Sequence, residues 1–129
     1  EINLASKRHI KIVQKALDDA TNSVNGTSYG SRITGKYKMG GKTGTSQVRV
    51  ISSKEREDGI IKNKDLPWEM RDHGLFIGYG PIEKPTYSIS VIVEHGGSGS
   101  GSAAPIASKI MKYIFKSKVN LKRKNLINV

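Results

Sequence analysis

The chain of 129 residues has no cysteine, so disulfides and thiolate metal sites are excluded and the redox compartment stays undetermined. It also lacks an apolar run of about 18 residues that could span a membrane, and it begins at Glu1 without a methionine or a signal peptide. The three histidines, His9, His73 and His95, lie far apart without metal-ligand spacing. We expect a soluble domain, or a piece of one cut from a longer protein, with no metal and no cofactor.

The formal net charge of +11 suggests a nucleic-acid partner, but the distribution of charge argues against one. Residues 1–51 carry nine basic and three acidic side chains, and residues 116–129 carry five basic and no acidic ones. The middle of the chain is balanced, and no basic aromatic strand or helix-turn-helix pattern is present. A lysine-rich solvated surface with a basic tail is the simpler interpretation, and a basic binding module stays open as an alternative.

Hydrophobic periodicity predicts two helices and three strands. The first helix covers residues 7–20, with Ser6 as its N-cap. The strands are residues 42–51, 75–79 and 87–93, separated by an irregular charged segment (52–67) and a turn (81–85). A glycine-rich connection (96–102) leads to a helix over 103–117 whose buried stripe is Ile106, Ile110, Met111, Ile114 and Phe115. This order predicts an α+β fold, an antiparallel sheet packed with helices.

Two glycine-containing segments resemble nucleotide-binding loops and fail the tests for them. Gly41-Lys42-Thr43 could end a Walker motif, but Lys36 stands where that motif needs its first glycine, and a strand follows instead of a helix. Gly97-x-Gly99 could begin a dinucleotide fingerprint, but Ser102 replaces the third glycine. A plain strand-to-helix connection explains the second segment better.

The segment Lys42-Thr43-Gly44-Thr45 fits acyl transfer in residue type and order. A lysine on a strand supplies a fixed positive charge to a substrate carboxylate, and a hydroxyl nearby can donate to the same group. A glycine between them lets the substrate backbone lie against the strand. Alternation along a strand would direct Lys42 and Gly44 to one face and Thr43 and Thr45 to the other.

Residues 37–48 around this segment resemble class B penicillin-binding proteins. The stretches Arg71-Asp72-His73-Gly74-Leu75-Phe76, Val93-Glu94-His95-Gly96-Gly97 and Ala103-Ala104-Pro105 are similar to the elongation-type member, penicillin-binding protein 2. The resemblance implies the C-terminal part of a transpeptidase domain over residues 1–117, with 118–129 as a flexible basic tail. Its three strands would be the third to fifth of the family's sheet, and the first two would be missing.

The resemblance also implies roles for individual residues. Lys42 would hold the electrostatics of the site, and Thr43 and Thr45 would bind the carboxylate of a stem peptide or a β-lactam beside Gly44. The backbone N–H of Thr45 would be an oxyanion donor. The implied partners are a D-Ala-D-Ala stem peptide, β-lactams and the cell-elongation machinery, at the periplasmic face of the inner membrane and with an anchor outside this chain.

The nucleophile of the family is missing, because no serine here is followed by lysine three residues on. We expect the fragment alone to be inactive, a structural piece of its parent, and to self-associate through exposed strand edges. Ser23-Val24-Asn25 matches the family's Ser-x-Asn element by chance, since it follows the first helix. Asp72 and His73 are adjacent on a strand and have structural roles, as do Glu94 and His95, and Trp68 anchors a loop on the sheet.

Overall fold

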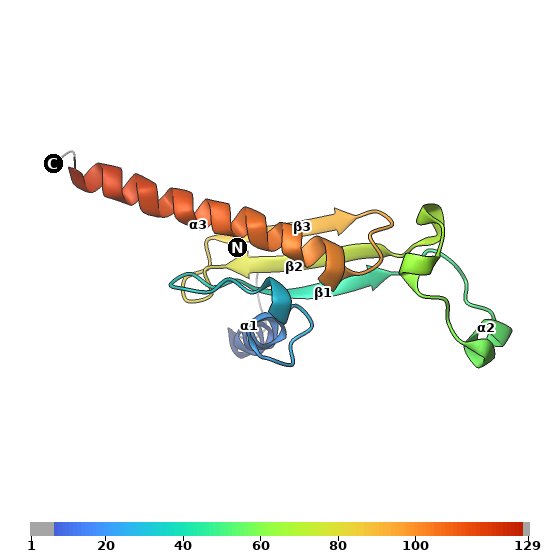
Figure 1. Cartoon of the computed structure of the whole chain (residues 1–129). Helices are drawn as coiled ribbons and strands as arrows, with labels where there is room; N and C mark the ends of the chain where they lie inside the picture. Colours follow the sequence, from blue (N-terminus) through green and yellow to red (C-terminus); the bar gives the residue numbers. More distant parts are fainter. Residues whose placement is uncertain (1–6, 128–129) are drawn as a thin grey trace.

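The computed structural model describes the backbone of residues 7–127 and the side chains of residues 8–117. The elements follow in the order α1 (Lys7–Asn22), β1 (Gly40–Ser46), α2 (Ser53–Asp58), β2 (His73–Gly80), β3 (Tyr87–Val93) and α3 (Ala104–Ile127). A short helical turn, η4 (Gly99–Ala103), leads into α3. Figure 1 shows α3 running across one face of the sheet and α2 standing apart at the far end of the β1–β2 connection.

The three strands form one antiparallel sheet in the order β1-β2-β3, as the sequence predicts. Thr43 is opposite Phe76 in the first pair of strands, and Phe76 is opposite Val91 in the second. Within the part of the chain that the structure describes, β1 and β3 are therefore edge strands, each with one side unpaired by another strand. Self-association through these edges stays a prediction.

The core lies between α3 and the sheet face that carries Phe76. Phe76, Met39, Met111 and Phe115 are its largest side chains, and each is at most 5% exposed. Three alanines at the start of α3 complete the contact, and all are fully buried: Ala103, Ala104 and Ala107. Small residues on the helix let its axis approach the sheet closely.

Gly99 makes the closest contact between η4 and the sheet. A β-carbon at this position would lie 2.2 Å from the carbonyl oxygen of Leu75 and 2.4 Å from that of Gly44. Gly44 and Leu75 are opposite each other in the β1–β2 ladder. Because these are backbone atoms held in a sheet, they cannot move aside for a side chain, and glycine is required.

Helix α1 packs on the other face, over the start of β1. The hydroxyl of Tyr79 donates to the carbonyl oxygen of Gln14 at 3.2 Å, and the amide of Asn22 donates to that of Met39 at 2.9 Å. Apolar residues recur along α1 at three- and four-residue spacing, but the helix does not bury all of them, because Val13 is 56% exposed. The predicted N-cap, Ser6, lies outside the described residues. Further along this face, Ile77 and Ile92 are exposed by 56% and 65%.

The predicted strand over 42–51 is wrong at both ends, since β1 spans Gly40–Ser46. The ladder ends where Ser46 meets His73, so residues 47–51 have no strand opposite them. A strand needs a hydrogen-bonded neighbour, and β-propensity alone does not supply one. The N–H of Val48 instead donates to the carboxylate of Asp72 at 3.2 Å.

The charged segment 52–67 contains a helix that the sequence interpretation missed. Ser52 caps α2 by accepting a hydrogen bond from the N–H of Glu55 at 3.2 Å, and Gly59 ends it with a φ of 110°. Serine followed by glutamate three residues later is the capping-box pattern, so a local signal was present.

The last helix begins at Ala104, one residue after the predicted start, and continues to Ile127, ten residues past the predicted end at 117. The flexibility of residues 118–129 stays a prediction. Its buried stripe differs from the prediction, because Ile106 and Ile110 are 42% and 43% exposed while the alanines face the sheet. The close approach at Gly99 leaves no room for isoleucine on the inner side.

Replacing Gly99 by alanine tests this close approach. We expect Gly99→Ala to lower the free energy of unfolding by about 1–3 kcal/mol through overpacking. Gly30→Ala is the matched control, because a β-carbon there meets nothing within 4 Å, and its effect should stay within about 0.5 kcal/mol. Urea unfolding followed by circular dichroism measures both, and equal effects would contradict the packing argument.

Candidate active site

Lys42, Thr43, Gly44 and Thr45 all lie on β1, at the edge of the sheet (Figure 1). Thr43 is opposite the buried Phe76, so Thr43 and Thr45 belong to the α3 face. Lys42 is opposite Ile77, and therefore Lys42 and Gly44 belong to the face that carries the exposed Ile77. The register thus divides the four residues between the two faces in the way that strand alternation predicts.

The backbone of β1 presents polar groups along its free edge. Thr21 Oγ1 donates to the carbonyl oxygen of Gly41 at 3.1 Å, and Lys42 Nζ donates to that of Thr43 at 2.9 Å. Both oxygens therefore point away from β2. Because backbone groups point alternately to the two sides of a strand, the N–H of Thr45 lies along the same edge.

Hydrogen bonds between side chains hold Lys42 and Thr43 beside a loop that follows α1. Lys42 Nζ lies 3.4 Å from Thr43 Oγ1, and the Thr43 hydroxyl donates to Thr27 Oγ1 at 3.1 Å. The sequence interpretation missed Thr21 and Thr27, and no local signal could have found them, since both precede β1 along the chain. These contacts place the hydroxyls of Thr21 and Thr27 next to β1, beside that of Thr43 on the strand itself.

Arg49 and Glu55 form an ion pair within the long connection between β1 and β2. Arg49 Nη1 donates to Glu55 Oε2 at 2.7 Å, and the second guanidinium nitrogen donates to the other oxygen at 2.5 Å. Such a two-point pair is strong and directional. The Arg49 hydrogen bonds lower the pKa of Glu55 to about 2, and the N–H of Ile61, which donates to the same carboxylate at 3.3 Å, contributes. Glu55 in turn raises the pKa of Arg49.

Asp72 holds the other end of this connection. Its carboxylate accepts hydrogen bonds from the N–H of Val48 at 3.2 Å and from the amide of Asn63 at 2.9 Å. Its own N–H donates to Asn63 Oδ1 at 2.8 Å. Asp72 therefore joins the segment after β1 to the segment before β2, which holds the two ends of the connection together.

His73 and His95 contact each other at the end of the sheet. The N–H of His95 donates to Nδ1 of His73 at 2.9 Å, and Nδ1 of His95 lies 3.0 Å from the carbonyl oxygen of Arg71. The partners of His73 and Asp72 differ, which fits structural roles for both. No group of three or more histidine, aspartate or glutamate side chains within the described residues could hold a metal ion.

Trp68, predicted to anchor a loop on the sheet, contacts a residue at the end of the sheet and is only partly covered there. It is 55% exposed, and its ring centroid lies 4.5 Å from that of His95. The tryptophan therefore covers a histidine at the end of the sheet and is not packed beneath the loop. The two rings are tilted by 59°, and this contact leaves much of the indole exposed to water.

The Ser23-Val24-Asn25 match lies in a tight turn after α1. The N–H of Gly26 donates to the carbonyl oxygen of Ser23 at 2.8 Å, and the Ser23 hydroxyl lies 3.5 Å from a carboxylate oxygen of Asp19. Both contacts are local and belong to the end of a helix. That the match arises by chance stays a prediction.

A family model described as the penicillin binding protein transpeptidase domain matches residues 3–112. The chain belongs to this transpeptidase family. Curated relatives carry the name peptidoglycan D,D-transpeptidase MrdA. The relative from Haemophilus influenzae is 32% identical over 119 residues, which are 92% of this chain and 18% of the relative. The relative from Acinetobacter baumannii is 39% identical over 102 residues, 78% of this chain and 14% of the relative.

Solved structures of transpeptidases have the same arrangement. Penicillin-binding protein PBP2 from Helicobacter pylori, in a complex with MreC, superposes with a TM-score of 0.71 at 27% identity, over 89% of this chain and 18% of that one. PBP2 from Pseudomonas aeruginosa, in complex with WCK 5153, gives a TM-score of 0.61 at 29% identity, over 85% and 20%. The predicted α+β fold and the resemblance to penicillin-binding protein 2 are thus confirmed. The chain spans less than a fifth of the curated relatives' length.

The pair of Arg49 and Glu55 yields a prediction about pH. Since the pKa of folded Glu55 lies below its ordinary value of 4.5, the pair stabilises the connection fully above pH 4.5 and is lost as the pH falls through about 2. The amide signal of Ile61, which donates to Glu55, should titrate with an inflection near 2 in NMR spectra. An inflection near 4.5 would contradict the pairing, and Glu55→Gln should abolish this titration.

Proposed function

We propose that this chain supplies the Lys42–Thr45 strand of a serine-type D,D-transpeptidase that cross-links peptidoglycan. The observation that carries the proposal is the position of these residues on a free strand edge, with the Thr43 carbonyl and the Thr45 N–H along that edge. A peptide substrate can pair with such an edge as an added strand. The family of the chain and the names of its curated relatives support the same reaction.

In the proposed reaction, a serine oxygen adds to the carbonyl carbon of the penultimate D-Ala of a stem peptide. The peptide bond to the terminal D-Ala breaks, and this residue leaves with the proton lost by the serine hydroxyl. An amine of a neighbouring stem peptide then adds to the acyl carbon, the ester bond breaks as the cross-link forms, and the amine's proton passes to the serine oxygen. Each addition places negative charge on the carbonyl oxygen, which the N–H of Thr45 stabilises. The ammonium group of Lys42 and the hydroxyls of Thr43 and Thr45 hold the substrate carboxylate, and a β-lactam carboxylate takes the same place.

The nucleophile comes from a segment outside this chain, because no serine here is followed by a lysine three residues on. The direction of Lys42 indicates where that segment lies. Lys42 belongs to the face with Ile77, and this face is open beyond α1, since Ile77 and Ile92 are 56% and 65% exposed. We place the nucleophile-bearing segment on this open face, where it covers the apolar side chains and brings its serine beside Lys42.

The parent enzyme works at the periplasmic face of the bacterial inner membrane, as part of the machinery of cell elongation. The Helicobacter pylori neighbour was solved in a complex with MreC, which supports a partner of the same kind here. None of the helices within residues 7–127 is long and apolar enough to cross a membrane.

Removing the ammonium group of Lys42 tests its role in the parent protein. We expect Lys42→Ala to slow acylation by a labelled penicillin about 10²–10³-fold, the loss typical of one group that stabilises transition-state charge. Lys38→Ala is the matched control, since this exposed lysine lies just before β1. Stopped-flow acylation kinetics measure both variants, and unchanged kinetics in Lys42→Ala would exclude the proposed role.

The chain alone should form no covalent adduct with penicillin, because the attacking serine is absent. Intact-mass spectrometry after incubation with a labelled penicillin measures this, with the parent protein as a positive control. A stoichiometric adduct on the isolated chain would show that a serine within it is the nucleophile. In that case Ser23→Ala, in the Ser-x-Asn match, and Ser46→Ala, next to Thr45, would be the variants that locate it.

A further inference from the structure

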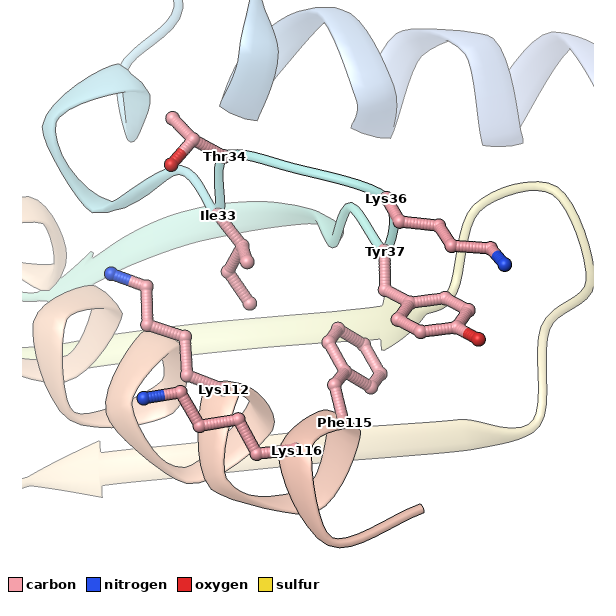
Figure 2. Close-up of a pocket in the computed structure, with 7 residues that line it drawn as sticks. All are labelled: Ile33, Thr34, Lys36, Tyr37, Lys112, Phe115 and Lys116. Carbon is pink, nitrogen blue, oxygen red and sulfur yellow. The ribbon is translucent and has the colours of Figure 1, made fainter. Parts of the chain in front are cut away.

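A hollow of about 480 Å³ lies between α3 and the loop that leads into β1. Its floor is apolar and is formed by Ile33 and Tyr37 from the loop and Phe115 from the helix, as Figure 2 shows. Ile33 and Phe115 are only 6% and 5% exposed, and the rings of Tyr37 and Phe115 lie 5.8 Å apart at a tilt of 46°. The floor is thus recessed and has room for an apolar side chain from outside.

Three lysines line the same hollow. Lys112 and Lys116 are on α3, one turn apart, and Lys36 is on the loop, with its nitrogen 5.6 Å from the centroid of the Tyr37 ring. The two salt bridges among the described side chains involve other residues, so none of these lysines is paired with a carboxylate there. After Glu94 the sequence contains no aspartate or glutamate, so α3 cannot neutralise its own charge. The hollow therefore combines an apolar floor with an uncompensated cationic rim.

We propose that this hollow binds an acidic peptide segment of a partner protein. One apolar side chain of the segment packs into the hollow against the paired rings of Tyr37 and Phe115, and carboxylates flanking it pair with Lys112 and Lys116. The two lysines are four residues apart on a helix, so carboxylates with the same spacing on a partner helix match them. Apolar anchors in pockets, surrounded by complementary charge, are the usual basis of specific docking.

The shape of the hollow favours a peptide over the other anionic partners. A membrane surface could meet the lysines, but it could not reach a floor that lies below them and is about 5% exposed. A nucleic-acid backbone would leave the same floor empty, and the buried Phe115 is no platform for base stacking. Only a partner with both acidic and apolar side chains uses the whole site. The inference is independent of the role proposed for Lys42.

The experiment uses the whole chain and three synthetic helical peptides. The first carries one tryptophan flanked by glutamates at four-residue spacing, the second has glutamine in place of each glutamate, and the third has alanine in place of the tryptophan. We expect the first peptide to bind, and each of the other two to bind at least about tenfold more weakly, by calorimetry at low salt. The NMR amide signals of Ile33 and Tyr37 should shift on binding.

Variants of the protein distinguish binding at the hollow from attraction by the net charge of the chain. Lys112→Glu combined with Lys116→Glu should weaken binding of the first peptide at least about tenfold. Lys54→Glu combined with Lys62→Glu changes the net charge equally at two exposed positions of the β1–β2 connection, away from the hollow, and should have little effect. Circular dichroism of all variants confirms that the fold is intact.

Three results would overturn the proposal. Equal loss of binding in the two double variants would show attraction by net charge alone. Equal binding of the peptides with and without tryptophan would show that the floor is not used. Binding to vesicles of phosphatidylglycerol and phosphatidylethanolamine, with no binding of the first peptide, would assign the lysines to a lipid surface.

Discussion

The contact between η4 and the backbone of β1 and β2 is the constraint on which the rest of the fold depends. Gly99 lies against the paired residues Gly44 and Leu75, where a β-carbon would be 2.2–2.4 Å from their carbonyl oxygens. The alanines that follow continue this close approach along α3. Gly44, within the candidate site, is thus in close contact with the helical turn η4, which supports this part of β1.

Charges in this molecule have two distinct environments. In the β1–β2 connection they are paired, since Arg49 binds Glu55 at two points and Asp72 joins Val48 to Asn63. These interactions order a segment with little apolar burial of its own, because Ile60 and Ile61 are about half exposed. Among the described side chains of α3, Lys109, Lys112 and Lys116 form no salt bridge with a carboxylate. The ion pair and the Asp72 hydrogen bonds therefore hold the connection in its conformation, while the unpaired lysines of α3 are available to bind other molecules.

Features with a local cause were predicted well from the sequence. The strand Tyr87–Val93 has the predicted bounds, because alternation and a short preceding turn specify it. The Lys-Thr-Gly-Thr segment and the stretches after it indicated the family, which the family match over residues 3–112 confirms. The capping signal at Ser52 and Glu55 was present and overlooked. The predicted bounds of β1 were wrong because they depend on the strand it pairs with. Nothing within residues 47–51 indicates that β2 begins only at His73, where the ladder stops.

The exposed isoleucines of α3 make the same point about packing. Hydrophobicity placed Ile106 and Ile110 inward, while the structure places alanines there and leaves both isoleucines about two-fifths exposed. The distance between helix and sheet decides which side chains fit, and the close approach of Gly99 to the paired residues Gly44 and Leu75 sets that distance. The contacts of Thr21 and Thr27 with β1 are equally non-local. Only the assembled fold brings these hydroxyls to the strand.

The length of the β1–β2 connection has a consequence for the order of folding. Strands β2 and β3 are joined by the short turn over 81–86, so this hairpin closes at small entropic cost. Strand β1 must find β2 across residues 47–72, and such a non-local pairing forms slowly. We therefore expect β1 to join a preformed hairpin. A partly folded chain then has the β2–β3 hairpin but no paired β1, so the candidate site forms only when folding is complete.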